Sequence, residues 1–306
     1  MCRLAPLPGG AQMQGFKGKV AVVTGGANGI GRSLGKRFAE EGMKVVLADI
    51  EEEALAKTVD EFTRQGFEVA GVRTDVADPA AIEALANQTV ERFGGVHILC
   101  NNAGVAGDLD FLSKRGERIW EHSMKDWKWT FDINFWGVVH GIRTFTPIML
   151  SQGQEGHIVN TASMAGLLSG PTADIYGATK HAVVRITEAL YHQLKLDHSP
   201  VSASVLCPGI IKTRIYSSGR NRPGALFEGD HPSGTDLRQQ AAEADTYWAK
   251  DGLSPDEVAG QVLQSIRDDQ LYILTRDVPL ERISERTENI VNGRNPRVTQ
   301  PRPIRP

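Results

Sequence analysis

Three side chains have the types and the spacing needed to move a proton to or from a small molecule. Tyr176 and Lys180 are four residues apart, which places both on the same face of a helix. An apolar series with a four-residue repeat (Ala178, Ala182, Ile186, Leu190, Leu194) independently supports the helix. A free phenol has a pKa of ~10 and accepts protons poorly at neutral pH. A lysine cation ~4 Å away, at an effective dielectric constant of ~20, contributes about 4 kcal/mol, which would bring the phenol close to the pKa of ~7 that suits acid–base catalysis.

Ser163 is the third of these side chains. It follows a predicted strand and precedes Tyr176 by 13 residues. A return from that strand to the helix can bring the two hydroxyl groups together. Ser163 could then donate a hydrogen bond to a substrate oxygen while Tyr176 transfers the proton.

A glycine-rich turn, Thr24–Gly31, stands between the first predicted strand and the first predicted helix. Glycine allows the backbone to turn sharply and to approach a pyrophosphate, which then faces the amides and the positive end of the helix dipole. Asp49 ends the next predicted strand, 18 residues after Gly31, near the ~20 expected for an acid that binds the adenosine ribose. The turn and the acid together predict a dinucleotide site.

Asp49 also indicates which nicotinamide dinucleotide is expected. A carboxylate accepts hydrogen bonds from the 2′- and 3′-hydroxyl groups of the ribose and repels a 2′-phosphate. Asn28 precedes Gly29, and Ile50 follows Asp49, so neither flank supplies a cation. Arg32 is the nearest positive charge, but its position on the helix is expected to turn it elsewhere. NAD is therefore expected as the cofactor rather than NADP.

The elements that must position these residues alternate between strands and helices. The strands are rich in Val, Ile and Leu with little in–out alternation, which is typical of strands covered on both faces. We expect strands at Val20–Val23, Val45–Ala48, Val69–Val72, Val96–Leu99, His157–Thr161, Ser202–Leu206 and Leu271–Leu274, and helices at Ile30–Glu41, Glu52–Gln65, Pro79–Phe93, Lys125–Leu150, Tyr176–Leu196 and Leu280–Val291. This order predicts an α/β fold, a doubly wound parallel sheet of about seven strands with helices on both faces.

The chain is expected to form a single catalytic domain over residues 18–276. Residues 210–251 are rich in Gly, Ser, Pro and Arg and too long for an ordinary connection, so we expect a loop that covers the substrate. Residues 1–17 are expected to be a flexible tail. Residues 277–306 are expected to form a helical extension followed by a tail rich in Pro and Arg.

Composition excludes several other classes of protein. The 306 residues carry 34 Lys and Arg against 37 Asp and Glu, so no basic surface for nucleic acid or an anionic membrane is expected. No apolar run approaches the ~18 residues of a membrane span. Cys2, Cys100 and Cys207 form no ligand pair, the histidines show no metal-binding spacing, and we expect no metal. The sparse cysteines suit a reducing compartment, and a cytoplasmic location is expected.

Several ordered motifs resemble those of the short-chain dehydrogenase/reductase family, in its single-domain branch with a Rossmann-type fold. The resemblance extends from about Gly18 to Leu274. It rests on Thr24–Gly31, Asp49, Asp75-Val76, Asn101-Asn102-Ala103-Gly104, Asn134, Ser163, Tyr176, Lys180 and Pro208-Gly209. The cofactor-binding residues that we expect are Gly25, Asn28, Gly29, Ile30, Gly31, Asp49, Ile50, Asp75, Val76, Asn102, Ala103, Gly104, Tyr176, Lys180, Pro208, Gly209, Ile211 and Thr213.

The resemblance implies a role for each catalytic candidate. Tyr176 would be the acid/base, and Ser163 would orient the substrate carbonyl. Lys180 would bind the nicotinamide ribose and lower the phenol pKa, while Asn134 would hold a water that relays protons to Lys180. By analogy, a homodimer or homotetramer is expected.

The predicted function is an NAD-dependent oxidoreductase that interconverts a secondary alcohol and a ketone by hydride transfer. The aromatic residues of the 210–251 loop favour a bulky apolar substrate. The added helix after Leu271–Leu274 resembles that of relatives that act on aromatic alcohols, which implies an aromatic substrate. One alternative is an NADPH-dependent 3-oxoacyl or polyketide ketoreductase, which Asp49 disfavours. Another is a non-catalytic protein that senses dinucleotides, which would not need the proton-transfer residues.

Overall fold

The computed structural model describes residues 13, 15–107, 118–170, 173–226, 242–243, 245–247 and 250–298. Seven parallel strands form one sheet in the order β3-β2-β1-β4-β5-β6-β7. Their bounds are β1 Val20–Thr24, β2 Lys44–Asp49, β3 Val69–Arg73, β4 Ile98–Asn101, β5 Gly156–Thr161, β6 Val201–Cys207 and β7 Tyr272–Leu274. The predicted doubly wound sheet is confirmed, and its order reverses between β1 and β4, where an open sheet leaves a crevice at its carboxyl edge.

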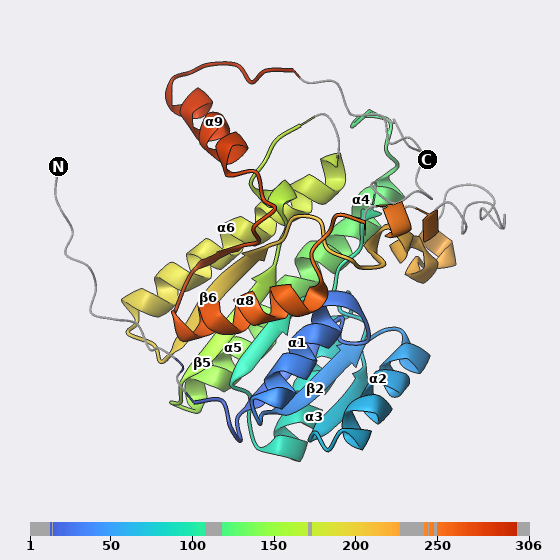
Figure 1. Cartoon of the computed structure of the whole chain (residues 1–306), viewed down its shortest axis with the longest axis vertical. Helices are drawn as coiled ribbons and strands as arrows, with labels where there is room; N and C mark the ends of the chain where they lie inside the picture. The colour runs from blue at the N-terminus through green and yellow to red at the C-terminus, as the bar shows by residue number, and fades with distance from the viewer. Residues whose placement is uncertain are drawn as a thin grey trace.

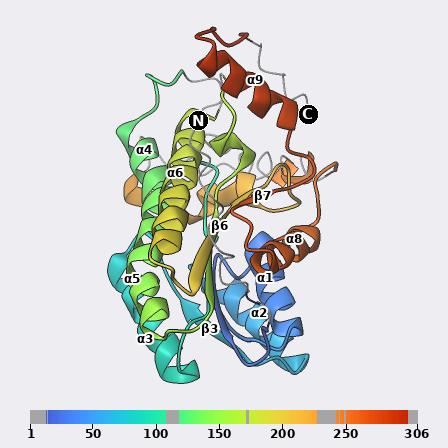
Figure 2. The same cartoon turned by 90° about the vertical axis from the view of Figure 1, so that its left-hand side faces the viewer.

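Helices cover both faces of the sheet (Figures 1 and 2). One layer contains α1 (Gly29–Glu40), α2 (Glu52–Arg64) and α8 (Pro255–Arg267). The other contains α3 (Pro79–Phe93), α4 (Met124–Phe131), α5 (Gly137–Ser151) and α6 (Asp174–Leu196). Because both faces are covered, the central strands β1, β4, β5 and β6 are buried throughout, as their continuous apolar runs predict, while the edge strands β3 and β7 are partly exposed.

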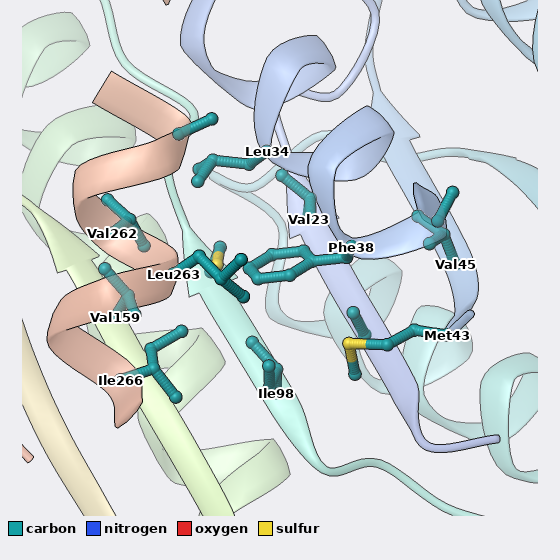
Figure 3. Packing of buried hydrophobic residues seen from close by; sticks show 14 of the residues in the cluster. Val23, Leu34, Phe38, Met43, Val45, Ile98, Val159, Val262, Leu263 and Ile266 are labelled. Atoms are coloured by element: carbon teal, nitrogen blue, oxygen red, sulfur yellow. The ribbon is translucent and has the colours of Figure 1, made fainter. Parts of the chain in front are cut away.

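The core beneath α1 and α8 holds the first helix against the sheet. Figure 3 shows Leu34 and Phe38 of α1 facing the apolar side chains of α8, above strand residues such as Val23 and Ile98. Phe38 is fully buried, and burial of one such side chain contributes about 1.5–3 kcal/mol. This packing fixes the start of α1, and therefore the glycine-rich turn that precedes it.

The helix predicted over Lys125–Leu150 is interrupted. A π-helix, η2 (Asp132–Trp136), separates α4 from α5. Ser123 and Asp126 form a capping box that starts α4. The π-turn adds a residue to the helical turn and rotates the chain that follows, and such turns are frequent at functional sites. Apolar periodicity did not reveal this interruption.

The N-terminal segment differs from the prediction, whereas the C-terminal helix agrees with it. Met13 and Phe16 fall within the predicted tail of residues 1–17, yet both are buried in the core, and the Arg267 guanidinium lies 5.1 Å from the centre of the Phe16 ring. Ordered structure therefore begins before the predicted boundary at Gly18, because two large apolar side chains in that segment are buried. The predicted terminal helix is confirmed as α9 (Leu280–Val291), which has no buried residue and extends away from the sheet (Figure 1).

The predicted loop of residues 210–251 contains local helical structure. It forms two short 3₁₀-helices, η4 (Ile215–Asn221) and η5 (Gly224–Leu226), while residues 227–241, 244 and 248–249 lie outside the described residues. We call residues 215–226 the strap. None of the helices in the described ranges combines the length and the apolar character needed to cross a bilayer.

Candidate active site

The glycine-rich turn leads from β1 into α1 at the carboxyl edge of the sheet. At Gly31 a β-carbon would lie 2.1 Å from the Gly25 carbonyl oxygen, so only glycine allows the turn and the helix to approach this closely. Gly25 has a φ of +66°, and its own β-carbon would lie 2.9 Å from Ala103 Cα. Asn28, the N-cap of α1, makes no side-chain hydrogen bond to the first turn of the helix. The amides of that turn are left for an anionic ligand, and this geometry fits a pyrophosphate.

Asp49 lies at the end of β2 beside this turn. Its Oδ2 accepts a hydrogen bond from the Ala27 amide at 2.9 Å, and its Oδ1 accepts one from the Glu51 amide at 3.0 Å. Burial raises the pKa of Asp49, while these backbone N–H groups oppose the increase. Each carboxylate oxygen retains a second lone pair, so the group can still accept hydrogen bonds from ribose hydroxyls. Arg32 points elsewhere as expected, since it pairs with Glu61 at 2.5 Å.

The loop after β4 forms the opposite side of the crevice. The amides of Asn102 and Ala103 donate to Thr24 Oγ1 at 2.9 and 3.1 Å, and Asn102 Nδ2 donates to the Thr24 carbonyl at 3.0 Å. Thr161 Oγ1 in turn donates to Asn102 Oδ1 at 3.4 Å. Asn102 thus connects the ends of β1, β4 and β5.

Tyr176 and Lys180 stand one turn apart near the start of α6. They are only 8% and 3% exposed, and Lys180 Nζ lies 5.5 Å from the centre of the Tyr176 ring. The prediction that the two side chains share one face of a helix is confirmed. Ala178, Ala182 and Ile186 are only half-buried, whereas the buried face also carries polar residues, including Thr179, Lys180 and Thr187. These polar side chains point into the protein because each makes a hydrogen bond there: Thr179 with Asn134, Lys180 with the Thr161 carbonyl and Thr187 with Asn160.

The Lys180 ammonium group is held in a buried position. Nζ donates to the Thr161 carbonyl at 3.0 Å. Burial lowers the pKa of Lys180 to about 8, with a smaller opposing effect from Cys207. At neutral pH the ammonium is still charged, so a cation stands beside the phenol. Cys207 itself is buried, and burial raises the pKa of its thiol to about 12, so it is an inert core residue.

Asn134 lies in the π-helix and is fully buried. Its Oδ1 accepts from the Val105 amide at 2.8 Å, while Nδ2 donates to the Val105 carbonyl at 3.0 Å and to Thr179 Oγ1 at 3.3 Å. A β-carbon at Gly104 would lie 3.2 Å from Asn134 Oδ1 and 3.5 Å from Lys180 Nζ, so glycine allows both groups to approach this loop. Both side-chain amide hydrogens of Asn134 already donate hydrogen bonds, so a bound water could interact with this residue only by donating to one of its oxygen atoms.

Ser163 follows β5 and caps a short 3₁₀-helix, η3 (Met164–Gly166). Its Oγ accepts a hydrogen bond from the Ala165 amide at 3.1 Å, which leaves the hydroxyl hydrogen available to a ligand. A β-carbon at Gly166 would lie 2.6 Å from the Lys180 carbonyl oxygen, so η3 packs closely against α6. The strand–loop–helix return predicted for Ser163 and Tyr176 is therefore present.

These elements surround one cleft of about 360 Å³. Predicted residues that line it are Gly25, Asn28, Gly29, Ile30, Asp49, Ile50, Asp75, Val76, Asn102, Ala103, Gly104, Tyr176, Lys180, Pro208 and Thr213. Gly31, Asn134, Ser163, Gly209 and Ile211 are not among the described residues that line it. The Ile211 side chain packs in the core because a β-bridge pairs this residue with Leu253, so only its backbone is left to contact a ligand.

Residues of the strap complete the cleft and were not predicted as site residues. Six of them line it, namely Ile215, Ser218, Arg220, Asn221, Pro223 and Leu226. Ser218 Oγ accepts from the Ala106 amide at 2.9 Å, and Arg222 Nη1 pairs with Asp126 of α4 at 2.5 Å. The Arg222 guanidinium lies 5.1 Å from the centre of the Trp129 ring, which also lines the cleft. The aromatic, loop-like composition of residues 210–251 was the only sequence signal for this wall.

The fold and the site define a doubly wound α/β protein with a dinucleotide-type cleft and a buried Tyr–Lys pair. Comparison with known proteins agrees with this class. Residues 19–223 match the family model described as short chain dehydrogenase. The chain belongs to the short-chain dehydrogenase/reductase family of oxidoreductases.

Individual relatives resemble the chain over nearly its whole length. A short-chain dehydrogenase/reductase from Burkholderia phymatum, solved in complex with NAD, has a TM-score of 0.85 and 44% identity, and the match covers 94% of this chain and 100% of that one. A CLA biosynthesis dehydrogenase/reductase from Lactiplantibacillus plantarum is 34% identical over 94% of this chain and 98% of its own. A 1-deoxy-11-beta-hydroxypentalenate dehydrogenase from Streptomyces avermitilis is 33% identical, over 88% and 89% respectively.

Proposed function

We propose that this protein is an NAD-dependent dehydrogenase that interconverts a secondary alcohol and a ketone. The observation that carries the proposal is that the Tyr176–Lys180 pair lines the same cleft as the glycine-rich turn and Asp49. The similar Burkholderia phymatum protein was solved with NAD, and the similar Streptomyces avermitilis protein is a dehydrogenase of a hydroxylated compound. Both findings support the cofactor and the reaction type.

The chain would hold the cofactor at three places. The first turn of α1 would bind the pyrophosphate, Asp49 would accept hydrogen bonds from the adenosine ribose, and Lys180 would donate to the nicotinamide ribose. When bound, the dinucleotide supplies the acceptor or donor of the hydride. The protein supplies the binding, the orientation and the proton transfer.

Proton transfer is assigned to Tyr176. In the direction of alcohol oxidation, the phenolate accepts the hydroxyl proton of the substrate, and in reduction the phenol donates it. The Lys180 cation favours the phenolate because opposite charges in a buried site attract strongly. Ser163 would donate its free hydroxyl hydrogen to the substrate oxygen, and Asn134 would hold a relay water near Lys180.

The substrate side of the cleft favours a bulky apolar compound. Val105, Trp129, Ile133, Pro223 and Leu226 line it. Arg222, the nearby buried cation, is already bound by Asp126 and by the Leu226 carbonyl oxygen. A substrate with a large apolar or aromatic group beside its carbinol carbon matches these walls.

The test compares Tyr176→Phe with Tyr191→Phe, a matched change on the same helix. Wild type and Tyr191→Phe are expected to reduce NAD⁺ with aromatic and aliphatic secondary alcohols. Tyr176→Phe is expected to lose at least about a thousandfold in kcat while its NADH affinity stays within about threefold. Full activity of Tyr176→Phe would refute the proton-transfer role, and tight NADH binding by a wild-type protein that turns over no alcohol or ketone would instead indicate a dinucleotide sensor.

We also infer a homodimer or homotetramer in which α5 and α6 form subunit contacts. Large apolar side chains on or beside these helices are exposed, including Trp136 (47%), Leu150 (41%) and Leu196 (71%). Light scattering coupled to size-exclusion chromatography is expected to give a multiple of the 33.3 kDa chain mass. A monomer at micromolar concentration would refute this assembly.

A further inference from the structure

An arginine of the strap closes the edge of the cleft at Asp49. Arg220 pairs through Nη2 with the Glu51 carboxylate, and Asn221 Nδ2 donates to the same Oε1 atom at 2.9 Å. Glu51 follows Asp49 by two residues, and both line the cleft. The pair therefore joins two segments, 169 residues apart in sequence, beside the carboxylate assigned to the adenosine ribose.

Glu51 adds a second negative charge at this edge. Burial alone would raise its pKa, but hydrogen bonds from Arg220 and Asn221 outweigh burial and lower the pKa of Glu51. The Glu51 amide also donates to Asp49 Oδ1 at 3.0 Å, so the two residues are held together. Burial and, to a smaller extent, the Glu51 charge raise the pKa of Asp49, as expected for two neighbouring carboxylates.

Arg220 is fixed in place by the strap itself. Its Nη1 donates to the Ser217 carbonyl at 2.9 Å and to the Arg214 carbonyl at 3.2 Å, and its side chain is 30% exposed. A guanidinium group binds phosphate well because it presents several donors in one plane. Here the Glu51 carboxylate occupies and neutralises that group.

Resting on the proposed dinucleotide site, we propose that the Glu51–Arg220 pair is a second determinant of cofactor choice. The pair disfavours a ribose 2′-phosphate in two ways. Glu51 adds electrostatic repulsion to that of Asp49, and it engages the arginine that would otherwise bind the phosphate. Removing the Glu51 charge alone should therefore improve binding of the phosphorylated dinucleotide, and removing Arg220 as well should reverse most of the improvement.

Glu51→Gln is a conservative test. Glutamine has nearly the same shape, and Glu51 makes no side-chain N-cap hydrogen bond to α2, so the helix keeps its start. Dissociation constants for NADH and NADPH are measured directly by fluorescence titration. In Glu51→Gln, the ratio of NADPH to NADH affinity is expected to rise about tenfold, equal to about 1.4 kcal/mol. NADH affinity is expected to change by less than about threefold because Asp49 remains.

Two further variants complete the test. Glu51→Gln/Arg220→Gln is expected to lose most of the gain in NADPH affinity. Glu52→Gln removes the same charge one residue further on, where the side chain is 77% exposed and lies 3.9 Å from Arg73, so its affinity ratio should stay within about twofold of wild type.

The outcomes separate this inference from the proposed function. An unchanged affinity ratio in Glu51→Gln, an equal gain in the double variant, or equal binding of NADH and NADPH by wild type would each overturn the role of the pair. A wild-type protein that binds neither dinucleotide would refute the proposed function together with the inference. A wild-type protein that binds NADH, with a ratio that Glu51→Gln leaves unchanged, would refute the inference alone.

Discussion

The buried ammonium group of Lys180 is expected to lower the free energy of unfolding of the protein, although the proposed reaction needs its charge. Its side chain is 3% exposed, and burial lowers its pKa from 10.5 to about 8. Lys180→Met replaces the charge with an apolar chain of similar length. We expect this variant to lose activity and yet unfold less readily than wild type at neutral pH.

The size of the effect follows from the two pKa values. The difference between 10.5 and about 8 corresponds to about 3 kcal/mol, since one pKa unit equals about 1.36 kcal/mol. The variant also loses the hydrogen bond from Nζ to the Thr161 carbonyl, which costs about 1 kcal/mol. The free energy of unfolding of Lys180→Met should therefore exceed that of wild type by about 2 kcal/mol at pH 7.

The difference should depend on pH in one direction. Below about pH 8, Lys180 is protonated in both the folded and the unfolded chain, and the full cost of the buried charge is present. Between about pH 8 and pH 10.5 the folded protein has released a proton that the unfolded chain still binds, so the stability of wild type rises relative to the variant. The advantage of Lys180→Met should shrink over this range and vanish before its upper end, where the lost hydrogen bond leaves the variant slightly less stable than wild type.

Urea unfolding followed by tryptophan fluorescence, at pH 7 and at pH 10, measures both effects. Lys57→Met, at an exposed position of α2, is the matched control and should stay within about 0.5 kcal/mol of wild type at both pH values. Two results would contradict this inference: a Lys180→Met protein that is less stable than wild type at pH 7, or a stability difference that does not change with pH. Either would show that burial of the ammonium group does not destabilise the folded protein.

Three other changes have clear expected results. Gly31→Ala places a β-carbon 2.1 Å from the Gly25 carbonyl oxygen, so NADH affinity should fall at least about thirtyfold in fluorescence titrations; unchanged affinity would refute the close approach. Arg222→Met removes the partner of Asp126 and should raise the KM for the alcohol several-fold while the NADH dissociation constant changes less than about twofold. Burial lowers the pKa of His157 to about 4, so wild type should lose stability as pH falls from about 6.5 towards 4; His157→Gln should remove up to about 3 kcal/mol of that loss in acid urea unfolding.

Much of the fold follows from patterns that act over a few residues. The apolar strand runs and the glycine-rich turn depend on neighbours in sequence, so they predict the observed strands and the start of α1. The cofactor half of the cleft was predictable for the same reason. In a parallel sheet the residues that follow consecutive strands meet at one edge, and this places Asp49 and Asn102 near the glycine-rich turn.

The features that could not be predicted depend on contacts between distant segments. The π-turn at Asn134 places its side chain against Val105 and Thr179, and no periodicity in the sequence distinguishes it from a regular helix. The core positions of Met13 and Phe16 likewise depend on packing with the rest of the domain, such as the contact of Phe16 with Arg267.

The expected preference for NAD depends directly on such contacts. From the sequence, Asp49 appears without a neighbouring cation, and that absence favours a ribose without a 2′-phosphate. The folded chain brings Arg220 to the same edge of the cleft, which taken alone would favour the phosphorylated cofactor. Glu51 binds this arginine and cancels its charge, so the preference inferred from Asp49 depends on a residue whose partner is 169 positions away. Cofactor choice at this edge is therefore set by the balance among Asp49, Glu51 and Arg220, and a change of one charge among them should be enough to move it.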